Sequence, residues 1–228
     1  MKSNLHNLDI LYEDNHLIAV NKRVGDLVQG DKTGDIPLPD LVKAYLKAKY
    51  QKPGAVFLGV VHRLDRPTSG VVVFARTSKA LSRMNRLFAE KDTQKTYWAL
   101  VENTRIPESG ELQHWLVRNT KQNKSYAHHK EVPNAKKARL FYTIRKRLER
   151  YQLLEIDLLT GRHHQIRAQL NAIGAHIKGD LKYGAKRSNP DGGICLHARK
   201  LCFTHPVKKE PICIEAPVPP TGIWQQIS

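Results

Sequence analysis

An uninterrupted apolar run at residues 71–75, with the sequence VVVFA, constrains the fold of this chain more than any other feature. A short run of β-branched and aromatic residues without polar alternation is typical of a buried strand. Ser69 and Gly70 precede it, so we expect the strand to start at a turn. The apolar stretch, residues 70–75, is far shorter than the ~20 residues that a membrane-spanning helix needs. A helical membrane protein is therefore excluded.

Further strands and three helices are expected from the periodicity of apolar residues. The expected strands are 10–12, 17–20, 95–101, 140–144 and 153–159. The expected apolar helix faces are Leu41, Tyr45 and Ala48, then Leu81, Met84 and Phe88, and finally Ile166, Leu170 and Ile173. Asp40 is the expected N-cap of the first helix and Thr77–Ser78 that of the second, whereas Gly174 ends the third. Strands and helices without regular βαβ alternation predict an α+β fold around one sheet.

The charge balance points to an anionic partner. Lys and Arg number 38 against 21 Asp and Glu, which gives a net charge of +17. Such an excess is typical of proteins that neutralise a nucleic-acid backbone, although a solvated basic surface without a ligand is the alternative. The segment 118–137 is rich in lysine and lacks apolar periodicity, so we expect an exposed loop or loose hairpin. Its lysines are Lys121, Lys124, Lys130, Lys136 and Lys137.

The three cysteines, Cys195, Cys202 and Cys213, are odd in number and form no C-x-x-C pair. This pattern argues against a disulfide framework and fits a reducing cytosol. Cys195 and Cys202 with His197 and His205 are a conceivable zinc set, but their spacing does not match that of structural zinc sites. We therefore expect core cysteines, strand-end histidines and no metal.

A first polar cluster, HRLDRPTSG at residues 62–70, places Asp65 between Arg63 and Arg66 just before the expected buried strand. A neighbouring arginine lowers the pKa of an aspartate by ~1–3 units and keeps it ionised as a nucleophile or base. A buried ion pair that fixes the turn has the same residue pattern. Spacing alone leaves both interpretations open.

A second cluster, TGRHHQIR at residues 160–167, begins the third expected helix. Unpaired backbone N–H groups at a helix start favour anions, and Arg162 adds a positive charge there. Arg167 borders the apolar stripe, so its guanidinium can point into a cleft. A capped surface helix with a basic face is the alternative.

Residues 62–70 together with VVVFA resemble the signature of the RluA family of RNA pseudouridine synthases. Supporting blocks follow in the family's order from about residue 9 to residue 220. They are YED at 12–14, AVNK at 19–22, KTY at 95–97, TGR at 160–162, HQIR at 164–167, GD at 179–180, YG at 183–184, LHA at 196–198 and HP at 205–206. The resemblance implies a single catalytic domain over residues 1–228, with a mixed, largely antiparallel central sheet flanked by helices. The family's small N-terminal RNA-binding domain has no counterpart in these blocks.

The resemblance implies a cofactor-free isomerase that detaches uracil from its ribose, rotates it and reattaches it through carbon. Asp65 matches the family's nucleophile, Arg167 the arginine that pairs with it, and Tyr97 the ring that stacks on the flipped base and can handle a proton. Arg63 matches the residue that helps to displace the base, and Leu196 lines the base pocket. Further substrate contacts are expected from Arg162, Lys121, Lys124, Lys136 and Lys137.

These expectations describe a cytoplasmic monomer that modifies ribosomal or transfer RNA without a metal or a membrane partner. A non-catalytic RNA-binding or chaperone protein fits the charge equally well, but it has no need of Asp65, Tyr97 and Arg167 together. A metal-dependent nuclease or deaminase is disfavoured, because neither an H-x-E with P-C-x-x-C nor a carboxylate cluster occurs.

Overall fold

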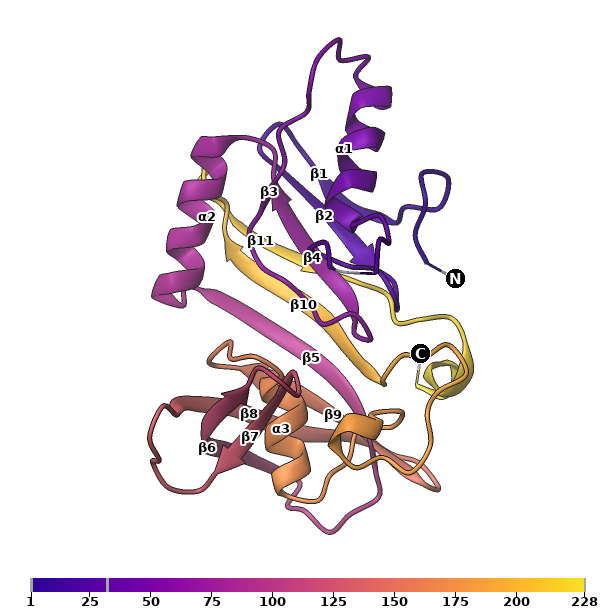
Figure 1. The fold of residues 1–228 in the computed structure, drawn as a ribbon, viewed down its shortest axis with the longest axis vertical. Coiled ribbons are helices and arrows are strands. Elements are labelled where there is room, and N and C mark those ends of the chain that lie inside the picture. Colours follow the sequence, from indigo (N-terminus) through magenta and orange to yellow (C-terminus); the bar gives the residue numbers. More distant parts are fainter. Residues whose placement is uncertain (1, 32, 228) are drawn as a thin grey trace.

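The computed structural model describes residues 2–31 and 33–227, and the strands among them join into one eleven-stranded sheet (Figure 1). Its main path runs β1-β2-β4-β10-β5-β9-β8-β6-β7, with β3 paired to β4 and β11 paired to β10. The strands are β1 (Ile10–Glu13), β2 (Leu17–Lys22), β3 (Gly59–Val60), β4 (Ser69–Ala75), β5 (Thr93–Glu102), β6 (Ser109–Asn119), β7 (Lys124–His128), β8 (Lys136–Arg147), β9 (Tyr151–Leu158), β10 (Leu196–Thr204) and β11 (Pro211–Glu215). The helices are α1 (Leu38–Lys49), α2 (Ser78–Glu90) and α3 (Gln165–Ala172), with short 3-10 helices η1 (Leu181–Tyr183) and η2 (Gly222–Gln226).

Strand β4 carries the apolar run and is buried along its whole length, as predicted. It pairs antiparallel with β2 and parallel with β10. The other strand pairs among the described residues are antiparallel. The expected α+β fold with a mixed, largely antiparallel sheet is therefore confirmed.

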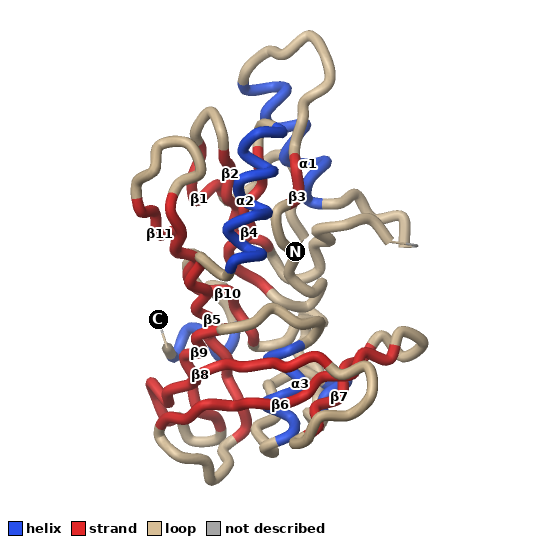
Figure 2. The backbone as a smooth tube through the Cα atoms, turned by 90° about the vertical axis from the view of Figure 1, so that its left-hand side faces the viewer, coloured by secondary structure: helices blue, strands red, loops and turns tan. Residues whose placement is uncertain are grey.

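Helices cover both faces of β4, which explains why this strand lacks polar alternation. Successive side chains of a strand point to opposite faces. Val72 and Phe74 share a core with α1, whereas Val71 and Val73 share a core with α2. Helix α3 lies at the other end of the sheet, next to β6 and β7 (Figure 2).

Helix α1 differs from its prediction in both start and orientation. It begins at Leu38 after the N-cap Pro37, so Asp40 lies inside the first turn and is not the cap. Proline suits a helix start because it has no N–H to leave unpaired. The residues that the helix buries are Leu38, Pro39, Val42 and Leu46, not the predicted Leu41, Tyr45 and Ala48. Both sets have helical spacing, so only packing against the sheet selects between them.

The predicted α2 and the predicted strands are confirmed, but the predicted start of α3 is wrong. Because His164 has a left-handed backbone with φ +51°, the helix begins only at Gln165, and Arg162 lies in the turn before it. Thr77 caps α2 by accepting the N–H of Ala80 at 3.1 Å, and α3 buries Ile166 and Leu170. The basic segment 118–137 forms a hairpin: β6 ends in it, β7 crosses it and β8 begins in it. The prediction of a hairpin is thus correct, although its arms are regular strands of the sheet.

The structure contains a disulfide between Cys202 and Cys213, so the expectation of unpaired core cysteines is wrong for these two residues. Strand β11 pairs antiparallel with β10 so that these two residues lie directly opposite each other, with their Cα atoms 4.1 Å apart. Cysteine number and spacing carry no information on this register. Cys195 is free and buried, as expected.

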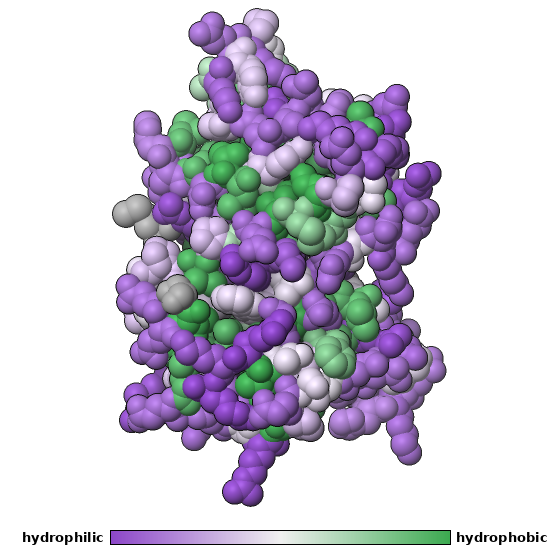
Figure 3. All heavy atoms as spheres, turned by 180° about the vertical axis from the view of Figure 1, so that it is seen from behind, coloured by the Kyte–Doolittle hydropathy of each residue, from purple (hydrophilic) through white to green (hydrophobic). Residues whose placement is uncertain are grey.

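On the side of the molecule that faces away from the viewer in Figure 1, the apolar surface forms separate patches. Figure 3 shows these patches surrounded by hydrophilic residues on that face. Scattered apolar surface of this kind is normal for a folded domain. Among the helices of residues 2–31 and 33–227, none is long and apolar enough to cross a membrane.

Gly70 permits the close approach of β4 to β10, and we predict that its replacement is costly. It has a φ of +115°, and a Cβ there would lie 2.3 Å from the carbonyl oxygen of Ala198. Gly70→Ala should lower the free energy of unfolding by about 3 kcal/mol, because it strains the backbone and pushes β10 away. Gly54→Ala, with no atom within 4 Å, is the control and should change the free energy by less than about 1 kcal/mol. Equal stability of the two variants in chemical denaturation would contradict this prediction.

Candidate active site

Asp65 lies in the loop between β3 and β4, and a buried lysine holds the backbone of that loop. The side chain of Lys22 is fully buried. Its Nζ donates to the carbonyl oxygens of Arg23 at 3.0 Å, Arg66 at 3.1 Å and Thr68 at 2.6 Å. Burial lowers the pKa of Lys22 to about 8, so the ammonium still carries its donors at neutral pH. The chain on the C-terminal side of Asp65 is therefore fixed from the interior.

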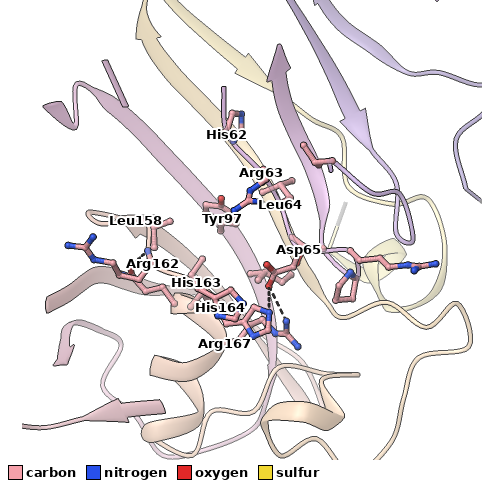
Figure 4. A pocket seen from close by; sticks show the side chains of 18 of the residues that line it. His62, Arg63, Leu64, Asp65, Tyr97, Leu158, Arg162, His163, His164 and Arg167 are labelled. Atoms are coloured by element: carbon pink, nitrogen blue, oxygen red, sulfur yellow. Dashed lines mark hydrogen bonds and ion pairs between the residues drawn. The ribbon is translucent and has the colours of Figure 1, made fainter. Parts of the chain in front are cut away.

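Arg167 of α3 joins Asp65 to a second carboxylate. Its Nε and Nη2 donate to the two oxygens of Asp180 at 2.7 and 2.8 Å, and its Nη1 donates to Oδ2 of Asp65 at 3.0 Å (Figure 4). Side-chain exposure is 1% for Asp180, 6% for Arg167 and 30% for Asp65. Burial opposes the charge of Arg167, but the hydrogen bonds and charges of Asp180 and Asp65 outweigh it and raise the arginine's pKa. The arrangement orients an accessible carboxylate with a buried, doubly anchored cation.

His164 makes a second, neutral approach to Asp65. Its Nε2 lies 3.5 Å from Oδ2 of Asp65, and its Nδ1 lies 3.0 Å from the hydroxyl of Tyr183. Burial lowers the pKa of His164 to about 3, so the ring is uncharged at neutral pH. The backbone N–H of Ser125 donates to the Tyr183 hydroxyl at 2.8 Å. A chain of polar contacts from the β6–β7 hairpin thus orients this ring.

Tyr97 comes from β5, where it lies opposite Ala198 of β10 and Ile156 of β9. Its ring packs partly against the core and partly against the cleft that contains Asp65. Burial, and then the negative charge of Asp65, raises the pKa of the Tyr97 phenol. The hydroxyl is therefore protonated at neutral pH, and Figure 4 shows Tyr97 and Asp65 in the same pocket.

A cleft of about 720 Å³ brings six of the sequence-predicted residues together. They are Arg63, Asp65, Tyr97, Arg162, Arg167 and Leu196. These side chains come from the loop before β4, from β5, from β10, from the turn before α3 and from α3 itself. Arg167 points into this cleft as its place beside the apolar stripe predicted. The individual roles of the six residues remain proposals.

The cleft is also lined by residues that the sequence analysis gave no role. They are His62, Lys95, Arg118, His164 and Lys182 among others. Sequence signals existed for two of them, since Lys95 stands two positions before Tyr97 on one strand and His164 stands three before Arg167. Arg118 and Lys182 come from β6 and η1, which both contact α3 in the folded chain. The GD block at 179–180 carries the family resemblance, but no pattern in it indicates that Asp180 anchors Arg167.

The predicted substrate-binding lysines Lys121, Lys124, Lys136 and Lys137 do not line the cleft. They belong to the β6–β7 turn and the strands that follow it. Lys124 lies against an aromatic ring, with its Nζ 5.1 Å from the centre of the Tyr183 ring. Their contact with RNA therefore stays a prediction about the surface beside the cleft.

The conceivable zinc set is dispersed among other partners. Cys202 is in the disulfide, His197 Nδ1 lies 2.8 Å from Oγ of Ser69, and His205 faces Asp14 at 3.0 Å. In residues 2–31 and 33–227, no three His, Cys, Asp or Glu side chains are grouped so that they can hold a metal ion.

Two solved structures share this fold. Human RNA pseudouridylate synthase domain containing 4 superposes with a TM-score of 0.76 at 24% identity, covering 92% of this chain and 88% of the other. Human RNA pseudouridylate synthase domain containing 1 gives a TM-score of 0.74 at 22% identity, covering 100% and 96%. The fold is therefore that of pseudouridylate synthase domains.

Sequence comparison identifies the family. The profile described as RNA pseudouridylate synthase matches residues 16–172. Ribosomal large subunit pseudouridine synthase D of Xylella fastidiosa is 35% identical over 93% of this chain and 66% of its own length. The tRNA pseudouridine synthase C of Vibrio vulnificus is 33% identical over 96% and 94%. This chain belongs to the RNA pseudouridylate synthase family, which confirms the RluA-type resemblance, and it spans about two thirds of the length of several ribosomal relatives.

His62 lines the cleft, and we predict that its burial makes the folded protein less stable in mild acid. Its Nε2 accepts the N–H of Val73 at 3.1 Å, and burial lowers its pKa to about 4. An unfolded histidine titrates near ~6.5, so between these values the unfolded state binds more protons and stability falls as the pH falls.

We expect the free energy of unfolding to fall faster in the wild type than in His62→Gln between pH 6 and 4.5, by up to ~1.4 kcal/mol per pH unit. Chemical denaturation at several pH values measures the difference. An exposed-site control, His6→Gln, should follow the wild type. Parallel curves for the wild type and His62→Gln would show that His62 is not held neutral.

Proposed function

We propose that this chain is an RNA pseudouridine synthase that uses Asp65 as its nucleophile. In the reaction, the bond between N1 of uracil and C1′ of ribose breaks, the base rotates, and a bond from C5 to C1′ forms. The proton on C5 leaves and N1 gains one, so uridine and pseudouridine are isomers. The residues named here carry out this chemistry without a cofactor.

The contact between Arg167 and Asp65 is the observation that carries the proposal. A nucleophilic carboxylate has to be held in position, and the Nη1 donor of Arg167 orients Oδ2 of Asp65. Asp180 occupies the other edge of the guanidinium, which leaves Nη1 for Asp65. A structural ion pair has no need of a partly exposed member in a cleft beside an aromatic ring.

Tyr97, Arg63 and Leu196 suit the handling of a flipped base. Extruding a base from its stack costs a few kcal/mol, and stacking on an aromatic ring recovers about 1–3 kcal/mol. We propose that Tyr97 provides this ring and that its protonated hydroxyl exchanges a proton with the base. Leu196 packs against the base, and the exposed Arg63 enters the space that the base leaves.

The proposed substrate is a structured ribosomal or transfer RNA, the two classes named for the relatives. We propose a monomer acting in the cytoplasm, where these RNAs are used, with residues 1–228 working as one catalytic domain. We propose that this reducing compartment converts the disulfide between Cys202 and Cys213 to two thiols. Backbone pairing of β10 with β11 keeps them opposite each other.

Replacing Asp65 separates catalysis from RNA binding. Asp65→Asn keeps the shape of the side chain and removes the nucleophilic charge, so turnover should fall below detection while RNA affinity stays within about threefold. Release of tritium from RNA labelled at C5 of uridine measures turnover, and filter binding measures affinity. The exposed carboxylate variant Asp40→Asn is the control and should retain full activity.

Each outcome of this experiment has a distinct meaning. Clear turnover by Asp65→Asn would remove Asp65 from the nucleophile's role. A wild-type protein that binds RNA but releases no tritium from any cellular RNA would instead be the non-catalytic RNA-binding protein. That result would overturn the proposed function itself.

The basic hairpin gives a second, independent prediction. We propose that its lysines contact phosphates, each contributing about −0.7 to −0.9 to the slope of log affinity against log salt. Replacing the five lysines with Gln should flatten that slope by roughly 3–4 and weaken target and non-target RNA alike. Lys43→Gln with Lys47→Gln on α1 is the matched control. An unchanged slope would mean that the hairpin is merely solvated. The substituted lysines are Lys121, Lys124, Lys130, Lys136 and Lys137.

A further inference from the structure

Lys95 stands in the cleft beside the residue proposed to stack on the base. It precedes Tyr97 by two positions on β5, and residues two apart on a strand point to the same face, about 7 Å from each other. Both side chains line the cleft that contains Asp65. This separation is of the same order as that between a nucleotide's base and its phosphate.

The ammonium of Lys95 has no anionic or hydrogen-bonding partner among the described residues. Among the described residues, Nζ lies over the ring of Phe88, whose centre is 5.8 Å away. Five other cations of the cleft have hydrogen-bonding partners in the protein. Arg118 has none among the described residues, but its side chain is exposed to water. The partnered cations are Arg63, Arg66, Arg162, Arg167 and Lys182.

Lys95 is therefore a half-buried charge that the protein itself does not neutralise. Burial and then the nearby Lys91 lower its pKa, which is the direction expected of a cation that lacks a counter-ion. The neighbouring His62 is neutral near pH 7, since burial lowers its pKa to about 4. A partly desolvated ammonium without a partner is unfavourable unless a ligand supplies negative charge.

The opposite wall of the cleft leaves the ammonium open. Gly161 faces Lys95, and a Cβ at position 161 would lie 3.8 Å from Nζ. A larger side chain there would cover the ammonium, whereas the glycine leaves the space beside Nζ free for a ligand atom.

We propose that Lys95 binds a phosphodiester oxygen of the RNA next to the flipped uridine, so that Tyr97 and Lys95 hold the base and the backbone of one nucleotide. The proposal rests on the proposed function, since it assumes an RNA uridine in this cleft. A phosphate carries a full negative charge, unlike the neutral carbonyl groups of uracil, and it therefore compensates the ammonium better.

Three variants test the proposal with total RNA that carries tritium at C5 of uridine. Lys95→Gln should lower kcat/KM about 10- to 100-fold, mainly through KM, because a charge-assisted hydrogen bond to the substrate is lost. Its log–log salt slope in filter binding should be shallower by about 0.7, the value for one single-strand phosphate contact. Lys95→Arg should keep the slope. Lys91→Gln, an exposed lysine four positions earlier, is the matched control and should keep both slope and KM.

Thermal unfolding distinguishes binding from a structural role. Lys95→Met removes an unpaired, partly desolvated charge, so its Tm should equal or exceed that of the wild type although RNA affinity falls. A lower Tm together with normal KM would show that Lys95 only supports the fold. A fall in kcat with an unchanged salt slope would place the ammonium on the uracil. Either result overturns the phosphate assignment. Absence of tritium release from the wild type would instead overturn the proposed function. The two failures are distinguishable, because the Lys95 proposal depends on differences between variants and the proposed function depends on the wild-type activity.

Discussion

The hydrogen bonds of Arg167 are the interaction on which the site depends. One guanidinium joins the loop before β4, helix α3 and the loop before η1, three segments far apart in the chain. Because Asp180 is almost fully buried, its charge requires this partner, and a buried ion pair that loses one member costs about 3–5 kcal/mol. The fold and the proposed nucleophile thus depend on the same guanidinium.

The backbone around Asp65 depends on two further constraints. Lys22 fixes the carbonyl groups of the loop from the interior, and Gly70 lets β4 lie directly against β10. The contact between β4 and β10 also brings Leu196 to the same cleft as Asp65. The paired strands β4 and β10 therefore support the cleft, and the loop contributes the carboxylate that we propose as the nucleophile.

The cations of the cleft fall into two groups, those paired with acceptors of the protein and those left for a ligand. The cations that orient protein groups are paired with protein acceptors, as Arg167 is with Asp65 and Asp180. Lys95 has no such acceptor among the described residues, and its charge is compensated only by a ligand. This division explains how one cleft can both orient the Asp65 carboxylate and attract a polyanion.

The sequence by itself determined the buried strand at 71–75, the N-cap of α2, the core faces of α2 and α3, and the set of Asp65, Tyr97 and Arg167. These features follow from local patterns and from motifs in a fixed order. Tertiary structure decided which face of α1 is buried, since two faces of that helix have helical spacing. It also decided the pairing of Cys202 with Cys213, which depends on strand register, and the anchoring of Arg167 by Asp180. Those features arise from contacts between distant segments, and no periodicity within a segment encodes them.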